Sequence, residues 1–304
     1  MGIPRILKII RIHIVAGGVL AFSIGALLAV VNGKSFFDPV YVVLCYVVVL
    51  LGDLSTHYSN DYFDVEVDKF VERKKFFAGS TILVTHPKLR LSAKLISISF
   101  WALSTMIAVA MVLFYGAPME FLIIALGENL LGWAYSAPPF RLISRGLGEI
   151  TVAAVTGFAI PGIGYLALRG HLDPLFVYLA VPFVMYGLML SLSLGAPDRE
   201  IDRKGGKRSL VVRKGEHFTF SLILAMALLA TLLFCVYAWQ IKSTVLNLGI
   251  VFLFSLAPLT AGLLGFVKAL QKKDVNRYST ANVASLFLFN MLMITYLAAI
   301  AATT

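Results

Sequence analysis

The residues of this chain that are best suited to chemistry form two clusters of carboxylates, each placed directly after a long apolar run. In the first cluster Asp61, Asp64 and Asp68 lie at i, i+3 and i+7, so a helix would place them on one face. In the second, Asp198 and Asp202 lie one turn apart. A carboxylate near lipid costs free energy, so carboxylates that occur there usually have a function. Their hard oxygen atoms suit Mg²⁺, which binds through carboxylates together with substrate phosphates. The clusters therefore predict a site for Mg²⁺ and a polyanion. They read Asn60-Asp61-Tyr62-Phe63-Asp64-Val65-Glu66-Val67-Asp68 and Asp198-Arg199-Glu200-Ile201-Asp202.

Basic residues follow both clusters. Arg73, Lys74 and Lys75 come after the first, and Lys207 and Arg208 come after the second. A diphosphate is the polyanion we expect, because metal ions would neutralise it as a leaving group and basic side chains would bind its remaining oxygens. The alternative is that these lysines and arginines only anchor the chain at the cytoplasmic face of a membrane.

One tyrosine could stabilise the product of diphosphate loss. Ionisation of an allylic diphosphate produces a carbocation, which an aromatic face can stabilise without water. Tyr135 lies where an apolar run ends, at the expected depth of the carboxylate clusters. An aromatic residue that merely sits at the membrane interface is the alternative.

Other polar residues lie inside the apolar runs. Asp53 and His57 are one turn apart, and we expect them to bind or deprotonate a second substrate, with a plain hydrogen bond between helices as the alternative. Glu128, Asn129 and Asn290 are expected to make contacts between helices.

Composition predicts an integral membrane protein of one domain, residues 1–304. The 304 residues are 59% hydrophobic and 14% charged, and the mean hydropathy is +0.88. The apolar runs are continuous, which favours an all-α bundle of nine transmembrane helices over a β-barrel. We expect the spans at about 11–31, 39–59, 93–115, 118–136, 148–168, 174–196, 217–239, 244–266 and 282–302.

The net charge of +10 reflects topology rather than nucleic-acid binding. Of the 26 lysines and arginines, all but Lys34, Arg169 and Lys242 fall on one side of the nine spans. The positive-inside rule then predicts a multi-pass protein of the cell membrane with a cytoplasmic amino terminus, cytoplasmic carboxylate clusters and an external carboxyl terminus.

The two clusters match a known pair of motifs. Asn60, Asp61, Asp64 and Asp68 fit Asn-Asp-x-x-Asp-x-x-x-Asp, and Asp198 and Asp202 fit Asp-x-x-x-Asp. With nine spans, the chain resembles the UbiA superfamily of intramembrane prenyltransferases over nearly its whole length. Further segments resemble the menaquinone-type (MenA) branch. These are Gly79-Ser80 with Ile82-Leu83-Val84, Tyr135-Ser136-Ala137-Pro138-Pro139-Phe140-Arg141-Leu142, Gly146-Leu147-Gly148-Glu149 and Gly206-Lys207-Arg208-Ser209-Leu210.

The resemblance implies a helical bundle around a cavity that opens sideways to lipid. In it Mg²⁺ holds an isoprenyl diphosphate, such as geranylgeranyl diphosphate, and an aromatic acceptor attacks the cation. Turnover is expected to depend on Asp64, Asp198 and Tyr135, with Lys207 contacting the diphosphate. By motif position, metal and diphosphate are expected to be held by Asn60, Asp61, Asp64, Asp68, Asp198 and Asp202.

Other functions stay open at this point. A geranylgeranylglyceryl phosphate geranylgeranyltransferase or a haem farnesyltransferase of the same superfamily shares the metal motifs. A secondary transporter also uses acids inside the membrane, but its acids lie near the midplane at broken helices, whereas these cluster at helix ends.

Overall fold

The structure is a computed structural model that describes residues 5–33, 38–71, 80–241, 246–271 and 276–303. Within these ranges every regular element is a helix, which confirms the predicted all-α class. Shorter helical turns are Arg5–Ile9, Pro87–Leu89, Leu142–Arg145, Val155–Ala159 and Ala196–Asp198. The α-helices are α1 (Ile12–Val31), α2 (Pro39–Phe63), α3 (Val65–Asp68), α4 (Ile82–Thr85), α5 (Arg90–Tyr115), α6 (Met119–Ser136), α7 (Gly148–Ala154), α8 (Ile160–Arg169), α9 (Pro174–Gly195), α10 (Arg199–Lys204), α11 (Leu210–Gln240), α12 (Leu248–Leu270) and α13 (Asn276–Ala301).

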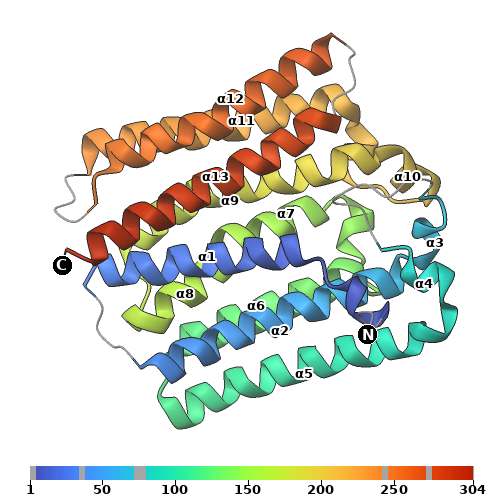
Figure 1. Cartoon of the computed structure of the whole chain (residues 1–304), viewed down its shortest axis with the longest axis horizontal. Coiled ribbons are helices and arrows are strands. Elements are labelled where there is room, and N and C mark those ends of the chain that lie inside the picture. The colour runs from blue at the N-terminus through green and yellow to red at the C-terminus, as the bar shows by residue number, and fades with distance from the viewer. Residues whose placement is uncertain (1–4, 34–37, 72–79, 242–245, 272–275, 304) are drawn as a thin grey trace.

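Each predicted span corresponds to a helix or a helical stretch in the described residues. Eight of these are long and apolar enough to cross a membrane, and the ninth is α6, which is 18 residues long and carries Glu128 and Asn129. The span predicted at 148–168 is two helices, α7 and α8, joined by one turn of π-helix. Figure 1 shows α11 and α12 on one side of the bundle, α2 and α5 on the other, and α1 between them.

Several helices begin at residues that cap them. Asp38 accepts a hydrogen bond from the backbone nitrogen of Val40 before α2, and Asp173 accepts two such bonds before α9. In both cases proline follows at the first helical position, where its missing N–H costs nothing. Ser209 caps α11 in the same way.

Small residues allow α1 and α8 to cross closely. A Cβ atom on Gly25 would lie 1.9 Å from the carbonyl oxygen of Pro161, and one on Gly164 would lie 2.2 Å from that of Phe22. Any larger residue would force the two backbones apart, and small residues are typical of close helix packing in membranes. The crossing fixes one wall of the bundle interior.

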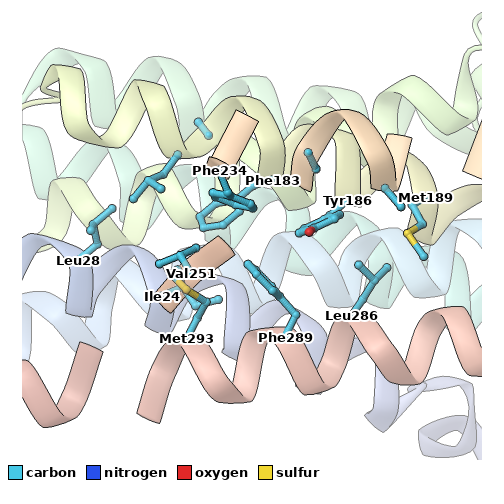
Figure 2. Packing of buried hydrophobic residues seen from close by; sticks show 14 of the residues in the cluster. Ile24, Leu28, Phe183, Tyr186, Met189, Phe234, Val251, Leu286, Phe289 and Met293 are labelled. Carbon is cyan, nitrogen blue, oxygen red and sulfur yellow. The ribbon is translucent and has the colours of Figure 1, made fainter. Parts of the chain in front are cut away.

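Aromatic side chains hold the second half of the bundle together. Phe289 of α13 stacks on Phe234 of α11 with ring centroids 5.9 Å apart, and it meets the ring edge of Tyr186 of α9 at 4.9 Å (Figure 2). Large apolar side chains elsewhere face outward, among them Phe114 and Trp239, which are 81% and 82% exposed. This is the pattern of a protein surrounded by lipid.

The topology can be tested with single cysteines. Lys204, in α10, and Trp239, at the far end of α11, are both exposed and lie at opposite ends of the bundle. In a background with Cys45 and Cys235 replaced by alanine, we expect Lys204→Cys to be protected from an impermeant thiol reagent in intact cells and Trp239→Cys to be labelled. The opposite pattern would overturn the predicted orientation.

Candidate active site

A cavity of about 350 Å³ lies inside the bundle between α1, α2, α6, α7 to α8, α9 and α13. The aspartates of the two motifs that line it lie at the end of the bundle that also holds α3 and α10 (Figure 1). Along α9 it extends from Phe183 to Gly195, which is about 18 Å of helix. Most of the remaining lining is apolar, including Ile24, Val155 and Leu286.

The carboxylate end is closed by a buried lysine that joins the two clusters. The ammonium nitrogen of Lys207 lies 2.8 Å from Oδ2 of Asp64 and 3.1 Å from Oδ1 of Asp202, and its side chain is only 8% exposed. Burial disfavours the charged form, but Asp64 and Asp202 outweigh it and raise the pKa of Lys207 above its usual value. Lys207 is therefore a fixed cation between the two motifs.

The backbone around Lys207 is held on several sides. Its own backbone nitrogen donates to the carbonyl of Asp202 at 2.9 Å, and the nitrogen of Leu210 donates to Oε1 of Glu149 at 2.7 Å. A Cβ on Gly205 would lie 2.7 Å from Val67, so only glycine lets this loop pack against α3. These contacts place the lysine independently of its ion pairs.

Five of the six predicted metal residues line the cavity: Asn60, Asp64, Asp68, Asp198 and Asp202. Asn60 donates to Oγ of Ser136 at 2.9 Å. Burial, and then the negative charges of Asp61 and Asp64, raise the pKa of Asp68 to about 8. Burial and the neighbouring aspartates therefore favour the protonated form of Asp68.

Asp61 lies elsewhere. Its carboxylate is fully buried and pairs with the guanidinium of Arg11 at 2.6 Å, and it does not line the cavity. The helical spacing that we used for Asp61, Asp64 and Asp68 assumed one continuous helix, but α2 ends at Phe63 and Asp64 is its C-terminal cap. Asp61 lies within α2, before this break, and faces Arg11 of the amino-terminal segment.

The donor set fits a hard divalent cation only with help from a substrate. One carboxylate oxygen of Asp64 is buried without a hydrogen-bond partner, and the cavity end offers mainly oxygen ligands. Among the described residues, however, no three carboxylate, imidazole or thiol groups lie together as a metal site. Phosphate oxygens would complete such a coordination shell, as is usual for Mg²⁺.

The basic residues predicted for the diphosphate are placed differently from one another. Lys207 lines the cavity, whereas Arg208 is exposed and outside its lining. Arg73, Lys74 and Lys75 lie outside the described residues.

Tyr135 lies in the cavity wall near the Lys207 ion pairs, as its predicted role requires. A Cβ on Gly148 would approach its ring to 3.2 Å and the backbone of Ile143 to 2.7 Å. The absence of a side chain at Gly148 therefore leaves room for the tyrosine ring beside the site.

The second pair, Asp53 and His57, also lines the cavity, with Nε2 of His57 3.4 Å from Oδ1 of Asp53. Asn129 makes the expected contact between helices, donating to Oγ of Ser104 at 2.9 Å. Glu128 and Asn290 instead face the cavity.

Sequence reasoning missed Arg11, Glu128 and Glu149 as residues of the cavity. Glu149 is the last residue of the segment Gly146-Leu147-Gly148-Glu149, which resembles the family. Glu128 is a carboxylate within an apolar run, and such residues are usually functional. Arg11 carried no signal beyond its place before the first span.

A model of the UbiA prenyltransferase family matches residues 19–301. The chain belongs to this family. A UbiA homolog from Archaeoglobus fulgidus bound to DMAPP and Mg²⁺ is 18% identical with a TM-score of 0.73, over 99% of this chain and 100% of that one. A UbiA homolog from Aeropyrum pernix K1 is 14% identical with a TM-score of 0.67, over 92% and 98%.

A structure described as giving insights into the biosynthesis of digeranylgeranylglyceryl phosphate synthase in membranes is 17% identical. Its TM-score is 0.66, over 96% of this chain and 97% of that one. At these identities the structures show that the UbiA fold is shared. A search of the curated proteins finds no match.

The ion pairs of Lys207 predict its effect on stability. Lys207→Met leaves Asp64 and Asp202 buried without a cation, which typically costs about 3–5 kcal/mol. In Mg²⁺-free detergent solution we expect a clearly lower unfolding temperature than for wild type. Lys204→Met, which removes an exposed lysine three residues away, is the matched control and should leave it unchanged. Equal unfolding temperatures for both variants would contradict the bridging role.

Proposed function

We propose that this member of the UbiA family transfers a prenyl group from an isoprenyl diphosphate to an aromatic acceptor of the menaquinone type, in a Mg²⁺-dependent reaction. The observation that carries the proposal is the meeting of both aspartate motifs at Lys207, at one end of a cavity that is otherwise largely apolar. That end suits a polyanion and the remainder suits a hydrocarbon chain. The proposed site faces the cytoplasm.

The residues at the polar end of the cavity have two roles, which are to hold Mg²⁺ and to bind the diphosphate. Asn60, Asp64, Asp68, Asp198 and Asp202 would hold Mg²⁺ through their oxygens. Bound Mg²⁺ supplies charge neutralisation for the departing diphosphate. Lys207 lies where its ammonium can bind the phosphate oxygens that the metal leaves free. Bonds to the diphosphate thus form at one end of the cavity and leave the prenyl chain in the apolar part.

The chemical step breaks the bond between C1 of the prenyl group and the bridging oxygen, and the electron pair leaves with the diphosphate. The face of Tyr135 stabilises the allylic cation. A ring carbon of the acceptor then forms a bond to C1, and the proton displaced from that carbon goes to an oxygen of the released diphosphate. The apolar lining keeps water from capturing the cation first.

A glyceryl phosphate acceptor is the second candidate, because the digeranylgeranylglyceryl phosphate synthase structure shares this fold. The carboxyl oxygens of Asp53 and Glu128 in the cavity wall, however, suit a hydroxyl donor better than a second phosphate. We therefore favour the aromatic acceptor.

The proposal is tested by product mass. Purified protein with Mg²⁺ and labelled geranylgeranyl diphosphate is offered dihydroxynaphthoate, hydroxybenzoate or geranylgeranylglyceryl phosphate. We expect a prenylated aromatic lipid, and chelation of Mg²⁺ should abolish it. A product formed only from the glyceryl phosphate would replace the first candidate by the second.

Asp64→Asn and Asp198→Asn should each lower this turnover below about a tenth of wild type, because each removes a negative metal ligand. Glu66→Gln and Glu200→Gln are matched controls, since both carboxylates are exposed beside the motifs. Loss of activity in the controls as well would show that charge removal alone disturbs the site.

Replacing Tyr135 should slow the chemical step without weakening diphosphate binding. A cation over an aromatic face in a dry site is worth about 2 kcal/mol, so Tyr135→Ala should slow single-turnover chemistry roughly thirtyfold. Tyr135→Phe keeps the ring and should be mild. Diphosphate affinity should hardly change in either variant. An equally damaging Tyr135→Phe would instead assign the role to the hydroxyl group.

A further inference from the structure

One stretch of the cavity wall is polar although it lies well inside the membrane part of the bundle. Asp53 and His57 of α2 and Glu128 of α6 all line it. His57 precedes Asp64 by seven residues and Glu128 precedes Tyr135 by seven, so each lies about 10 Å deeper along its helix. The three side chains are therefore beyond the diphosphate end, where a second substrate would meet C1.

Glu128 is the most unusual of the three. It is 6% exposed, and the described part of the chain gives it no hydrogen-bond partner. Its neighbour Asn129 is fully engaged, donating to hydroxyl groups of Ser104 at 2.9 Å and Thr105 at 3.3 Å. A buried carboxylate without a partner inside a bundle is costly, and such groups mark functional sites in membrane proteins.

The other two side chains are oriented toward the same space. Nδ1 of His57 accepts from the backbone nitrogen of Arg11 at 3.4 Å, which leaves Nε2 to carry the proton and face Asp53. On the α1 side, a Cβ on Gly18 would lie 3.8 Å from Oδ2 of Asp53. The Asp53 carboxylate therefore reaches toward α1 at the cavity wall.

The side chains of Asp53, His57 and Glu128 determine which kind of ligand this part of the cavity can bind. The carboxyl oxygens of Asp53 and Glu128 accept hydrogen bonds, so the group that they bind must be a hydrogen-bond donor. A hydroxyl group on an aromatic ring meets this condition. A hydroxyl that donates to a carboxylate also makes its ring more electron-rich, which favours attack on a cation.

We propose that Asp53, His57 and Glu128 form the acceptor pocket and that Glu128 accepts a hydrogen bond from a hydroxyl group of a dihydroxylated aromatic acceptor. This rests on the proposed prenyl transfer and specifies its second substrate. The pocket binds the neutral, hydroxylated face of the acceptor and leaves a ring carbon toward the diphosphate end.

Naphthohydroquinone is the binding probe, and its dimethyl ether, which has no hydroxyl donor, is the control ligand. In the full-length protein, Glu128→Gln should weaken binding of naphthohydroquinone by about threefold to tenfold, the usual effect of losing one hydrogen bond. Binding of the dimethyl ether should be weak and equal in both proteins. Glu120→Gln, an exposed carboxylate on the same helix, is the matched control variant.

Two further measurements separate the alternatives. The unfolding temperature of Glu128→Gln should equal that of wild type, because the described residues give Glu128 no hydrogen-bond partner to lose, whereas a structural role requires a fall. The Kd for geranylgeranyl diphosphate with Mg²⁺ should change less than twofold. If naphthohydroquinone binds wild type and Glu128→Gln equally, the proposed hydrogen bond to Glu128 is wrong, even if the protein carries out prenyl transfer. If diphosphate binding and turnover fail in wild type, the proposed function is wrong, and the probe still tests the pocket.

Discussion

The ammonium group of Lys207 lies between Asp64, which ends α2, and Asp202 of α10, and the geometry of the cavity depends on this contact. The two carboxylates come from distant parts of the chain, and Asp68 and Asp198 line the same end. Without a cation among them, these four groups would repel one another in a place where water screens little. A lysine held by its own backbone contacts lets the bundle close before any metal arrives.

The same contact explains how the site can be stable when empty and can still bind a diphosphate with its divalent cation. The lysine satisfies one oxygen of each of two aspartates, but Oδ1 of Asp64 stays without a partner. A diphosphate with its divalent cation would supply the missing positive charge to the aspartates and new acceptors to the lysine. In the proposed reaction the cavity is thus divided by chemistry into an anion end, an apolar channel and a polar acceptor wall.

Much of this arrangement could be predicted from the sequence, because apolar runs of membrane length and the two aspartate motifs are local patterns. The boundaries were less predictable. α11 begins at Leu210 rather than near 217, because Ser209 caps a short charged segment that a kink at Gly215 (φ 82°) separates from the apolar helix. Apolarity marks the part of a helix that lies in lipid, not the whole helix.

The contacts between distant residues could not be predicted. Asp61 shares its motif with Asp64, yet it lies within α2 and pairs with Arg11, a residue with no motif of its own. Glu128 and Asn129 are adjacent in sequence, but the rotation of α6 directs one into the cavity and the other onto Ser104. Such outcomes depend on which helices become neighbours.

The most direct test of this account is a crystal structure of the protein with Mn²⁺ and a non-hydrolysable isoprenyl diphosphate analogue, with the metal located by anomalous scattering. We predict metal between the Asp64 and Asp198 motifs, with the ammonium of Lys207 bound to phosphate oxygens and the prenyl chain in the apolar part of the cavity. Metal and diphosphate bound outside the cavity, with Lys207 still joining Asp64 to Asp202, would contradict it.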